Sequence, residues 1–259
     1  ANGSFYELID VEGGAQERVV QGGMHQLAVY LARQLREPVV FDAPVSSIEQ
    51  SQDGVLVRHA KGELHARRVV IAMAPSMARK IAMNPRCEAR DRLGARMPMG
   101  SVVKCLVAYE RPFWRSRGFS GEFVSDRAPF SPTFDASPPD GSCGLLVGFV
   151  AGPDAVRLSG HPEARRKEVI ASLVTAFGPE AAHPIDYLDH DWIADPWSEG
   201  CYVGLPAPGA LSELGPALRE AHGRVHWAGT ETAEAWTGYI EGALNSGERV
   251  AKEVMRAGR

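Results

Sequence analysis

The stretch SVVKCLVAYE, residues 101–110, constrains the fold of this chain more than any other. Alternate residues of an extended strand lie on opposite faces of its sheet. One face therefore carries Val102, Lys104, Leu106 and Ala108, and the other carries Val103, Cys105, Val107 and Tyr109. Both faces are apolar apart from the lysine, which predicts a strand buried on both sides within a layered structure.

Lys104 is the exception in this strand. A charged side chain inside a sheet is costly unless it is paired or reaches water. Two interpretations remain open from this stretch alone. Either Lys104 lines a wet cavity, or it lies near a strand end, where its stem carries the ammonium group to solvent.

Strands and helices alternate along the rest of the chain. Short apolar runs predict strands at residues 38–41, 54–59, 63–73, 142–150 and 224–229, with a hairpin turn at Lys61-Gly62. Helical spacing predicts helices at residues 23–36, at 162–177 between Pro162 and Gly178-Pro179, and from about Thr237 onward. The mixture predicts a fold of the α/β to α+β class with a mixed sheet.

Composition and charge exclude several classes of function. The chain has 259 residues, 44% of them apolar, which suits one large or two modest globular domains. Its net charge of −4 argues against a nucleic-acid partner, and no apolar run is long enough to span a bilayer. The four cysteines form no CxxC pair and no histidines have metal-ligand spacing, so we expect no metal site and reduced thiols in the cytoplasm.

The segment HWAGTET, residues 226–232, precedes the predicted C-terminal helix. Thr237 is the expected N-cap, and Gly238 would allow the backbone to approach a ligand closely. Helix N-termini attract anions, but many strand–loop–helix units share this pattern. We expect Ile240, Ala243, Leu244, Gly247, Val250, Ala251 and Val254 to face inward from this helix.

Cys201 lies in the segment WSEGCYVG, residues 197–204, directly before Tyr202. These residues alone leave its role open. Cys201 could be buried filler, half of a disulfide, a metal ligand, a nucleophile or the point of attachment of a cofactor.

Six segments together resemble the flavin-dependent monoamine oxidase family. They are DVEGGAQERVVQGG, APVSSIEQ, RVVIAMAPS, MPMGSVVKCLVAYERPFWR, WSEGCYVGLPAPG and HWAGTETAEAWTGYIEGALNSGERVA. They cover almost the whole chain in order. The resemblance implies part of a Rossmann-like FAD-binding domain at residues 1–73 and 201–259. It also implies a mixed-sheet substrate domain, flanked by helices, at residues 74–200.

The resemblance also implies roles for individual residues. Lys104 matches a lysine that holds a water near flavin N5, and Tyr202 and Tyr239 match two rings that flank the path of the amine. Cys201 matches the position where animal enzymes bind FAD through a thioether, with a free thiol as the alternative. Further cofactor contacts are implied at Val45, Trp192, Gly229, Glu231, Thr232, Tyr239 and Ile240, and a substrate cavity at Phe134 and Phe149.

The implied reaction is FAD-dependent oxidative deamination of a primary monoamine by O2 to aldehyde, ammonia and hydrogen peroxide. The alternatives are a polyamine or putrescine oxidase, an L-amino-acid oxidase, and a non-catalytic fragment of such an enzyme. The GxGxxG motif that binds the FAD pyrophosphate is absent from the sequence. We therefore expect a C-terminal portion that needs an N-terminal partner segment, in a bacterial protein without a membrane anchor that could form a homodimer.

Overall fold

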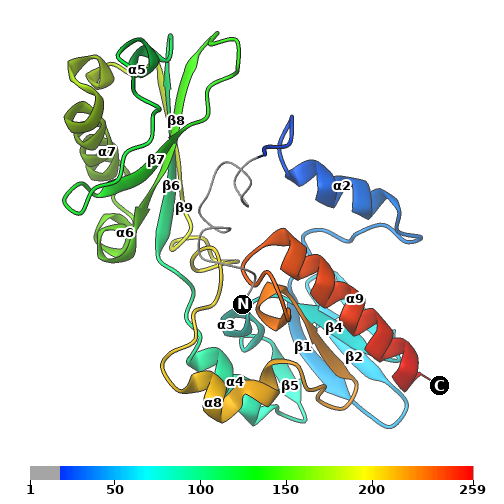
Figure 1. The fold of residues 1–259 in the computed structure, drawn as a ribbon. Helices are drawn as coiled ribbons and strands as arrows, with labels where there is room; N and C mark the ends of the chain where they lie inside the picture. Colours follow the sequence, from blue (N-terminus) through cyan, green and yellow to red (C-terminus); the bar gives the residue numbers. More distant parts are fainter. Residues whose placement is uncertain (1–17, 259) are drawn as a thin grey trace. The chain divides into compact units, whose positions relative to one another are not determined.

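The computed structural model describes residues 18–258 and divides them into two compact units (Figure 1). Unit 1 combines the described residues up to Leu93 with those from Leu211 onward, and unit 2 is Gly94–Ala210. Unit 2 is thus inserted into the sequence of unit 1. The segment DVEGGAQERVVQGG lies largely outside the described residues.

Unit 1 contains a four-stranded sheet with the order β3-β2-β1-β5. Its strands are β1 (Val45–Gln50), β2 (Val55–His59), β3 (Gly62–Ala66) and β5 (Ala82–Asn84). The first three form an antiparallel meander, and β5 runs parallel to β1. The predicted hairpin at Lys61-Gly62 is confirmed, because β2 and β3 pair across it.

A second sheet in unit 1 has two parallel strands that lie far apart in the sequence. Strand β4 (Val69–Ala72) pairs with β10 (Val225–Ala228), every residue of which is buried. Ile71 and Trp227 share a core with Ile48 of β1. The 18-residue helix α9 (Ile240–Ala257) lies along β10 (Figure 1). The other helical segments are α2 (His25–Arg33), α3 (Pro75–Ala78), α4 (Glu88–Ala95), α8 (Ala210–Leu214), η2 (Gly215–Leu218) and η3 (Thr230–Thr232).

Unit 2 is built on one antiparallel sheet with the order β7-β8-β6-β9. Its strands are β6 (Val102–Tyr109), β7 (Phe130–Asp135), β8 (Gly144–Ala151) and β9 (Asp186–Asp191). Helical segments α5 (Phe113–Ser116), α6 (Gly152–Leu158), α7 (Pro162–Phe177) and η1 (Pro179–Ala182) also belong to this unit. Val103, Val107 and Leu146 point from the sheet into a core that includes Trp114 and Leu173.

The structure differs from the sequence predictions at several elements. Residues 38–41 form no strand, and the predicted strand 63–73 is two strands, β3 and β4, in different sheets. Helix α9 buries Val250 as predicted, but its other buried residues are Gly242 and Ser246, whose small side chains allow close packing. Ile240 and Leu244, predicted to face inward, are exposed. Strand β6 is buried on one face only among the described residues.

The mixed α/β class predicted from the sequence is confirmed by this arrangement. Along the sequence, the boundaries between the compact units lie at residues 93/94 and 210/211, whereas the predicted domain boundaries lie at 73/74 and 200/201. The assignment of an FAD-binding and a substrate domain within the predicted boundaries stays a prediction.

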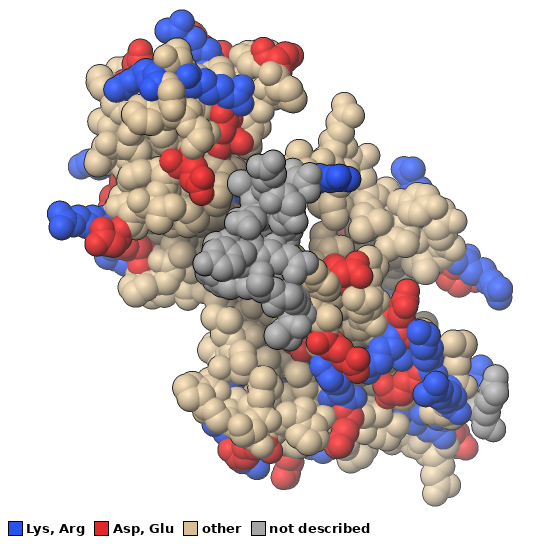
Figure 2. Space-filling view, in the orientation of Figure 1, with Lys and Arg blue, Asp and Glu red and all other residues tan. Residues whose placement is uncertain are grey.

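Charges of both signs are interspersed on the face of the molecule shown in Figure 2. Such a mixture gives no extended field of one sign that would gather a polyanion. Among residues 18–258, no helix is both long enough and apolar enough to cross a membrane.

Candidate functional site

Lys104 lies on the more exposed face of the unit 2 sheet, between two cross-strand neighbours. Antiparallel pairing places it opposite Phe149 of β8 on one side and His190 of β9 on the other. Directly opposed residues project on the same face with their Cβ atoms about 5 Å apart. The ammonium group therefore shares this surface with a phenyl ring and an imidazole.

The next row across this face is apolar. Leu106 lies opposite Val147 and Leu188, and Val147 lies opposite Phe134. Two rows thus stand side by side, one that carries Lys104 and one that carries only hydrocarbon and aromatic side chains. The fold brings Lys104, Phe134 and Phe149, predicted separately, onto one surface of one sheet.

Trp192 extends this surface beyond the end of β9. Its ring meets the imidazole of His190 edge-on, with the ring centroids 4.2 Å apart. The carboxylate oxygen Oδ2 of Asp195 lies 3.4 Å from His190 Nε2. Its other oxygen accepts hydrogen bonds from the backbone N–H groups of Trp197 and Ser198. His190 and Asp195 thereby link the sheet to the loop that carries Trp192.

Cys201 is held against the start of β6. Its N–H donates to the carbonyl of Gly100 at 2.8 Å, and Gly100 N–H donates to Val203 at 3.3 Å. A Cβ atom added at Gly100 would overlap the carbonyl oxygen of Cys201, so the two backbones can meet only at a glycine. Tyr202, which follows through a cis peptide bond, is 68% exposed.

The charge of Lys104 also acts on the thiol of Cys201. Burial raises the pKa of the Cys201 thiol, and the positive charge of Lys104 offsets part of that rise. A thiol with a raised pKa is a weak nucleophile at neutral pH, because the thiolate is the reactive form. The ammonium group of Lys104 is therefore close enough to Cys201 to modulate its reactivity.

In unit 1, the predicted residues Gly229, Glu231 and Thr232 directly follow β10, one of the two parallel strands. Met73 follows β4 and Gly229 follows β10, and a Cβ atom at Gly229 would lie 3.4 Å from the carbonyl oxygen of Met73. Ligands of parallel sheets bind at this carboxyl edge. Glu231, in the η3 turn directly after it, is only 6% exposed.

The polar groups of Thr232 are bonded inside the unit. Its hydroxyl donates to Gly229 at 2.8 Å and accepts from Arg249 at 3.1 Å, and Arg219 donates to its carbonyl. The residue is completely buried. Its predicted contact with a cofactor stays untested, and the role visible here is to hold the η3 turn.

The N-cap of α9 lies two residues later than predicted. Tyr239 occupies the N-cap position and no side chain caps the first turn, so Thr237 is not the N-cap. The reason is local: Trp236 and Gly238 have φ angles of +57° and +90°, which a helix cannot contain. The predicted cofactor contacts Ile240, the first residue of α9, and Val45, the first residue of β1, are 46% and 36% exposed.

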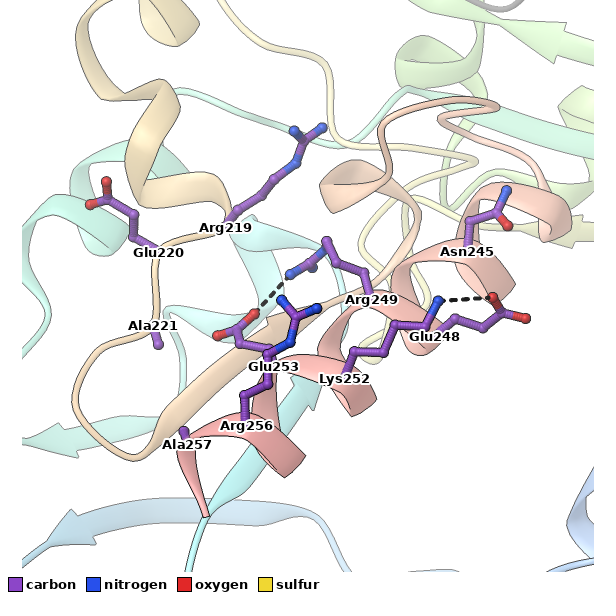
Figure 3. A pocket seen from close by; sticks show the side chains of 10 residues that line it. All are labelled: Arg219, Glu220, Ala221, Asn245, Glu248, Arg249, Lys252, Glu253, Arg256 and Ala257. Atoms are coloured by element: carbon purple, nitrogen blue, oxygen red, sulfur yellow. Dashed lines mark hydrogen bonds and ion pairs between the residues drawn. The ribbon is translucent and has the colours of Figure 1, made fainter. Parts of the chain in front are cut away.

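A hollow of about 820 Å³ lies elsewhere in unit 1, beside the C-terminal half of α9 (Figure 3). It contains none of the predicted site residues. Its charges are largely paired within the wall, with Arg249 bonded to Glu253 and Lys252 beside Glu248. Binding sites for small molecules are usually apolar with a few polar groups, so we place no site there.

The described residues contain no group of three His, Cys, Asp or Glu side chains that could hold a metal ion. Cys87, Cys105, Cys143 and Cys201 are all free thiols. Among the described residues, Cys201 is neither part of a disulfide nor a member of such a group.

A protein-family model shows to which family the chain belongs. Residues 1–255 match the family described as flavin-containing amine oxidoreductase. The chain belongs to this family. Among curated members, it is 39% identical over 256 residues to the "Probable flavin-containing monoamine oxidase A" of Dictyostelium discoideum.

Solved structures of amine oxidases share this fold. The cyclohexylamine oxidase from Brevibacterium oxydans IH-35A is 33% identical with a TM-score of 0.85, over 92% of this chain and 53% of that chain. A wild-type putrescine oxidase bound to putrescine is 28% identical with a TM-score of 0.91, over 98% and 57%. The alignment with the Dictyostelium protein covers 97% of this chain but only 56% of that protein, so the chain spans about half the length of such relatives.

The unit 1 residues fit the flavin that names this family of amine oxidoreductases. The first turn of α9 has no side-chain cap, which leaves a positive helix end available for a ligand that gains negative charge. Gly229, Glu231 and Ile240 lie near this end and near the carboxyl edge of β4 and β10. The phosphate-binding GxGxxG turn is absent from the chain, so these residues could hold only part of the cofactor.

Sequence reasoning did not single out His190 and Asp195, and the roles of the residues that it did name stay predictions. The signal of His190 and Asp195 was weak, because a histidine on an exposed strand face and an aspartate in a turn are both common. The cross-strand register with Lys104 gives His190 its significance, and only the structure supplies that register.

Proposed function

We propose that the protein takes part in FAD-dependent oxidative deamination of a primary monoamine. The observation that carries the proposal is the surface of unit 2 on which Lys104 lies between Phe149 and His190, beside an apolar row. An amine with a hydrocarbon substituent suits such a surface, because its apolar part gains by leaving water.

The net reaction converts R–CH2–NH2, O2 and water to R–CHO, NH3 and H2O2. The chemistry that FAD would supply when bound is the two-electron oxidation of the C–N bond, with O2 as the final electron acceptor. The substrate imine that results is hydrolysed to aldehyde and ammonia. The protein contributes by positioning the amine, excluding bulk water and placing charge.

Lys104 would hold an ordered water at its Nζ, beside the reacting carbon. Tyr202 and Tyr239 would present the faces of their rings to the amine nitrogen, which the electron-rich faces attract. The exposure of Tyr202, at 68%, supports its availability for such a contact. Phe134 and Phe149 would contact the apolar part of the substrate.

The residues that would contact the cofactor are Val45, Gly229, Glu231, Ile240, Trp192 and Cys201. Cys201 could carry a thioether to the flavin. The partial positive charge at the N-terminus of α9 would stabilise a reduced, negatively charged ring.

We further propose that an N-terminal segment of the parent protein completes unit 1. The β4–β10 sheet has only two strands in the described part of the chain, and two strands are too few for a stable sheet. Val70 and Met73 of this region are 40% and 39% exposed. A further strand along β4 would cover them and would bring the phosphate-binding turn that this chain lacks.

The proposal is tested by a visible absorbance spectrum of the protein that carries this chain, recorded before and after acid precipitation. Flavin absorbance that stays in the pellet supports a thioether at Cys201, and release to the supernatant supports a non-covalent site. Peroxide production is then measured with benzylamine, putrescine and L-leucine. Preference for putrescine or L-leucine contradicts the monoamine assignment, and a colourless, inactive protein contradicts catalysis.

A further inference from the structure

The segment that joins η3 to α9 is organised around the hydroxyl group of Thr230. The backbone N–H of Gly238 donates to Thr230 Oγ1 at 2.7 Å, and Thr230 Oγ1 donates to the carbonyl oxygen of Tyr239 at 3.1 Å. A hydroxyl has one proton and two lone pairs, so it can make both bonds at once. The side chain thus holds two successive residues directly before α9.

The backbone shape of this segment needs such support. Trp236 is a non-glycine residue at φ +57°, and Gly238 is at φ +90°. A bulky residue in the left-handed region persists only where its surroundings hold it there. The N–H of Tyr239 donates to the carbonyl of Trp236 at 3.0 Å, which closes a turn over residues 236–239. The hydroxyl of Thr230 bonds to Gly238 and Tyr239 of the same turn.

Helix α9 fits against this turn at a glycine. A Cβ atom at Gly242 would overlap the carbonyl oxygen of Trp236 and would lie 3.0 Å from Thr230 Oγ1. The rings of Trp236 and Tyr239 meet edge-on, with their centroids 5.5 Å apart. The hydroxyl of Thr230, the turn and the first helical turn therefore form one packed unit.

We propose that Thr230 is a positioning residue that sets the place of Tyr239 and of the α9 N-terminus through its hydroxyl group. Its effect on catalysis rests on the proposed function, in which Tyr239 contacts the amine. Its effect on the backbone does not, so the two parts can be tested separately.

The first test is hydrogen exchange followed by mass spectrometry on the full chain. In the wild type, the amide of Gly238 should exchange slowly despite its place in a loop. Thr230→Val, which keeps the shape but removes the hydroxyl, should raise exchange at least tenfold in peptides that cover residues 236–243. Thr230→Ser should restore protection. Ser172→Ala, which removes a buried hydroxyl that donates to Glu168 on α7, is the matched control and should leave residues 236–243 unchanged.

Two outcomes would overturn the backbone part. One is that the Gly238 amide of the wild type exchanges as fast as the amides of exposed loops. This measurement needs no variant, so it tests the proposal even if Thr230→Val does not fold. The other is a rise in exchange that spreads evenly over unit 1.

The second test compares steady-state oxidation of benzylamine by the flavin-loaded parent protein and its variants. Thr230→Val should lower kcat/KM by roughly 10- to 100-fold, because small displacements of a positioning group have effects of this size. Thr230→Ser should recover most of the loss. An unchanged kcat/KM in Thr230→Val would refute the catalytic part. A wild type with a protected Gly238 amide but no amine oxidation would refute the proposed function and leave the backbone role standing.

Discussion

Arg165 on α7 donates one hydrogen bond to each carboxylate oxygen of Asp189 on β9, at 2.8 Å in both cases. The two side chains are only 4% and 14% exposed. Tyr187 donates a third hydrogen bond to the same carboxylate at 2.8 Å. The ion pair attaches β9, the strand that carries His190, to helix α7. It therefore helps to hold in place the sheet on which Lys104 lies.

Replacing Arg165 should destabilise unit 2. Arg165→Met should lower the free energy of unfolding by about 3–5 kcal/mol, because it leaves the Asp189 carboxylate buried without its partner. The free energy of unfolding of Arg165→Lys should lie between those of the wild type and Arg165→Met, because a lysine keeps the charge but cannot donate in the bidentate geometry. Arg157→Met, which breaks exposed ion pairs with Asp154 and Glu168, is the control and should change little. Urea denaturation followed by circular dichroism measures all three; equal losses for the two methionine variants would contradict the argument.

The same pair predicts how stability depends on pH. Burial, the largest single effect, raises the pKa of Asp189, but the hydrogen bonds from Arg165 and Tyr187 and the positive charge of Arg165 together outweigh it, so the pKa lies below its ordinary value. A depressed pKa in the folded state stabilises above the unfolded pKa of about 4, and this contribution is lost as pH falls through the lower folded value. Melting temperatures of wild type and Asp189→Asn should therefore differ at pH 7, and the difference should shrink as pH falls below about 4. A gap that stays constant down to pH 3 would argue against this linkage.

Gly100 should not tolerate a side chain. Gly100→Ala forces a methyl group into the carbonyl of Cys201, and overpacking of this kind lowers stability by about 1–3 kcal/mol. Gly247→Ala, in the interior of α9 with open space around it, is the matched control and should raise helix stability by about 0.5–1 kcal/mol. Thermal unfolding of both variants checks this, and the idea fails if Gly100→Ala is as stable as the wild type.

The reactivity of Cys201 should depend on Lys104. The lysine charge lowers the pKa of this thiol against the effect of burial, so Lys104→Met should raise the pKa further. Less thiolate means slower alkylation. Iodoacetamide labelling at pH 8, quantified by mass spectrometry, should slow at Cys201 and stay constant at Cys143. An unchanged rate at Cys201 would show that the two residues are electrostatically independent.

Local patterns predicted elements whose signals lie within a few residues. The spacing between Pro162 and Gly178 gave the full extent of α7, and Lys61-Gly62 gave the β2–β3 hairpin. Residues 38–41 were a wrong prediction because β-propensity alone cannot make a strand. Val39, Val40 and Phe41 are exposed, and the described chain offers them no neighbouring strand.

The site was harder to predict where it depends on pairing between distant segments. The resemblance to a family named Lys104, Phe134 and Phe149, but the cross-strand register shows how they share one surface with His190. The role of Thr230 was hidden for a similar reason: its partner, Gly238, lies across a turn whose left-handed residues no sequence pattern indicated. Thr237, the better N-cap by composition, was therefore the wrong choice.

The parallel pairing of β4 with β10 has a consequence for the order in which the chain acquires structure. Residues of unit 2 leave the ribosome as one uninterrupted stretch, and domains generally fold as units during synthesis. Strand β4, made earlier, must wait for a partner strand that follows unit 2 in the sequence. A ribosome stalled before Val225 would therefore present a finished unit 2 and an unfinished unit 1, so premature termination before Val225 should yield a half-native chain that proteases degrade.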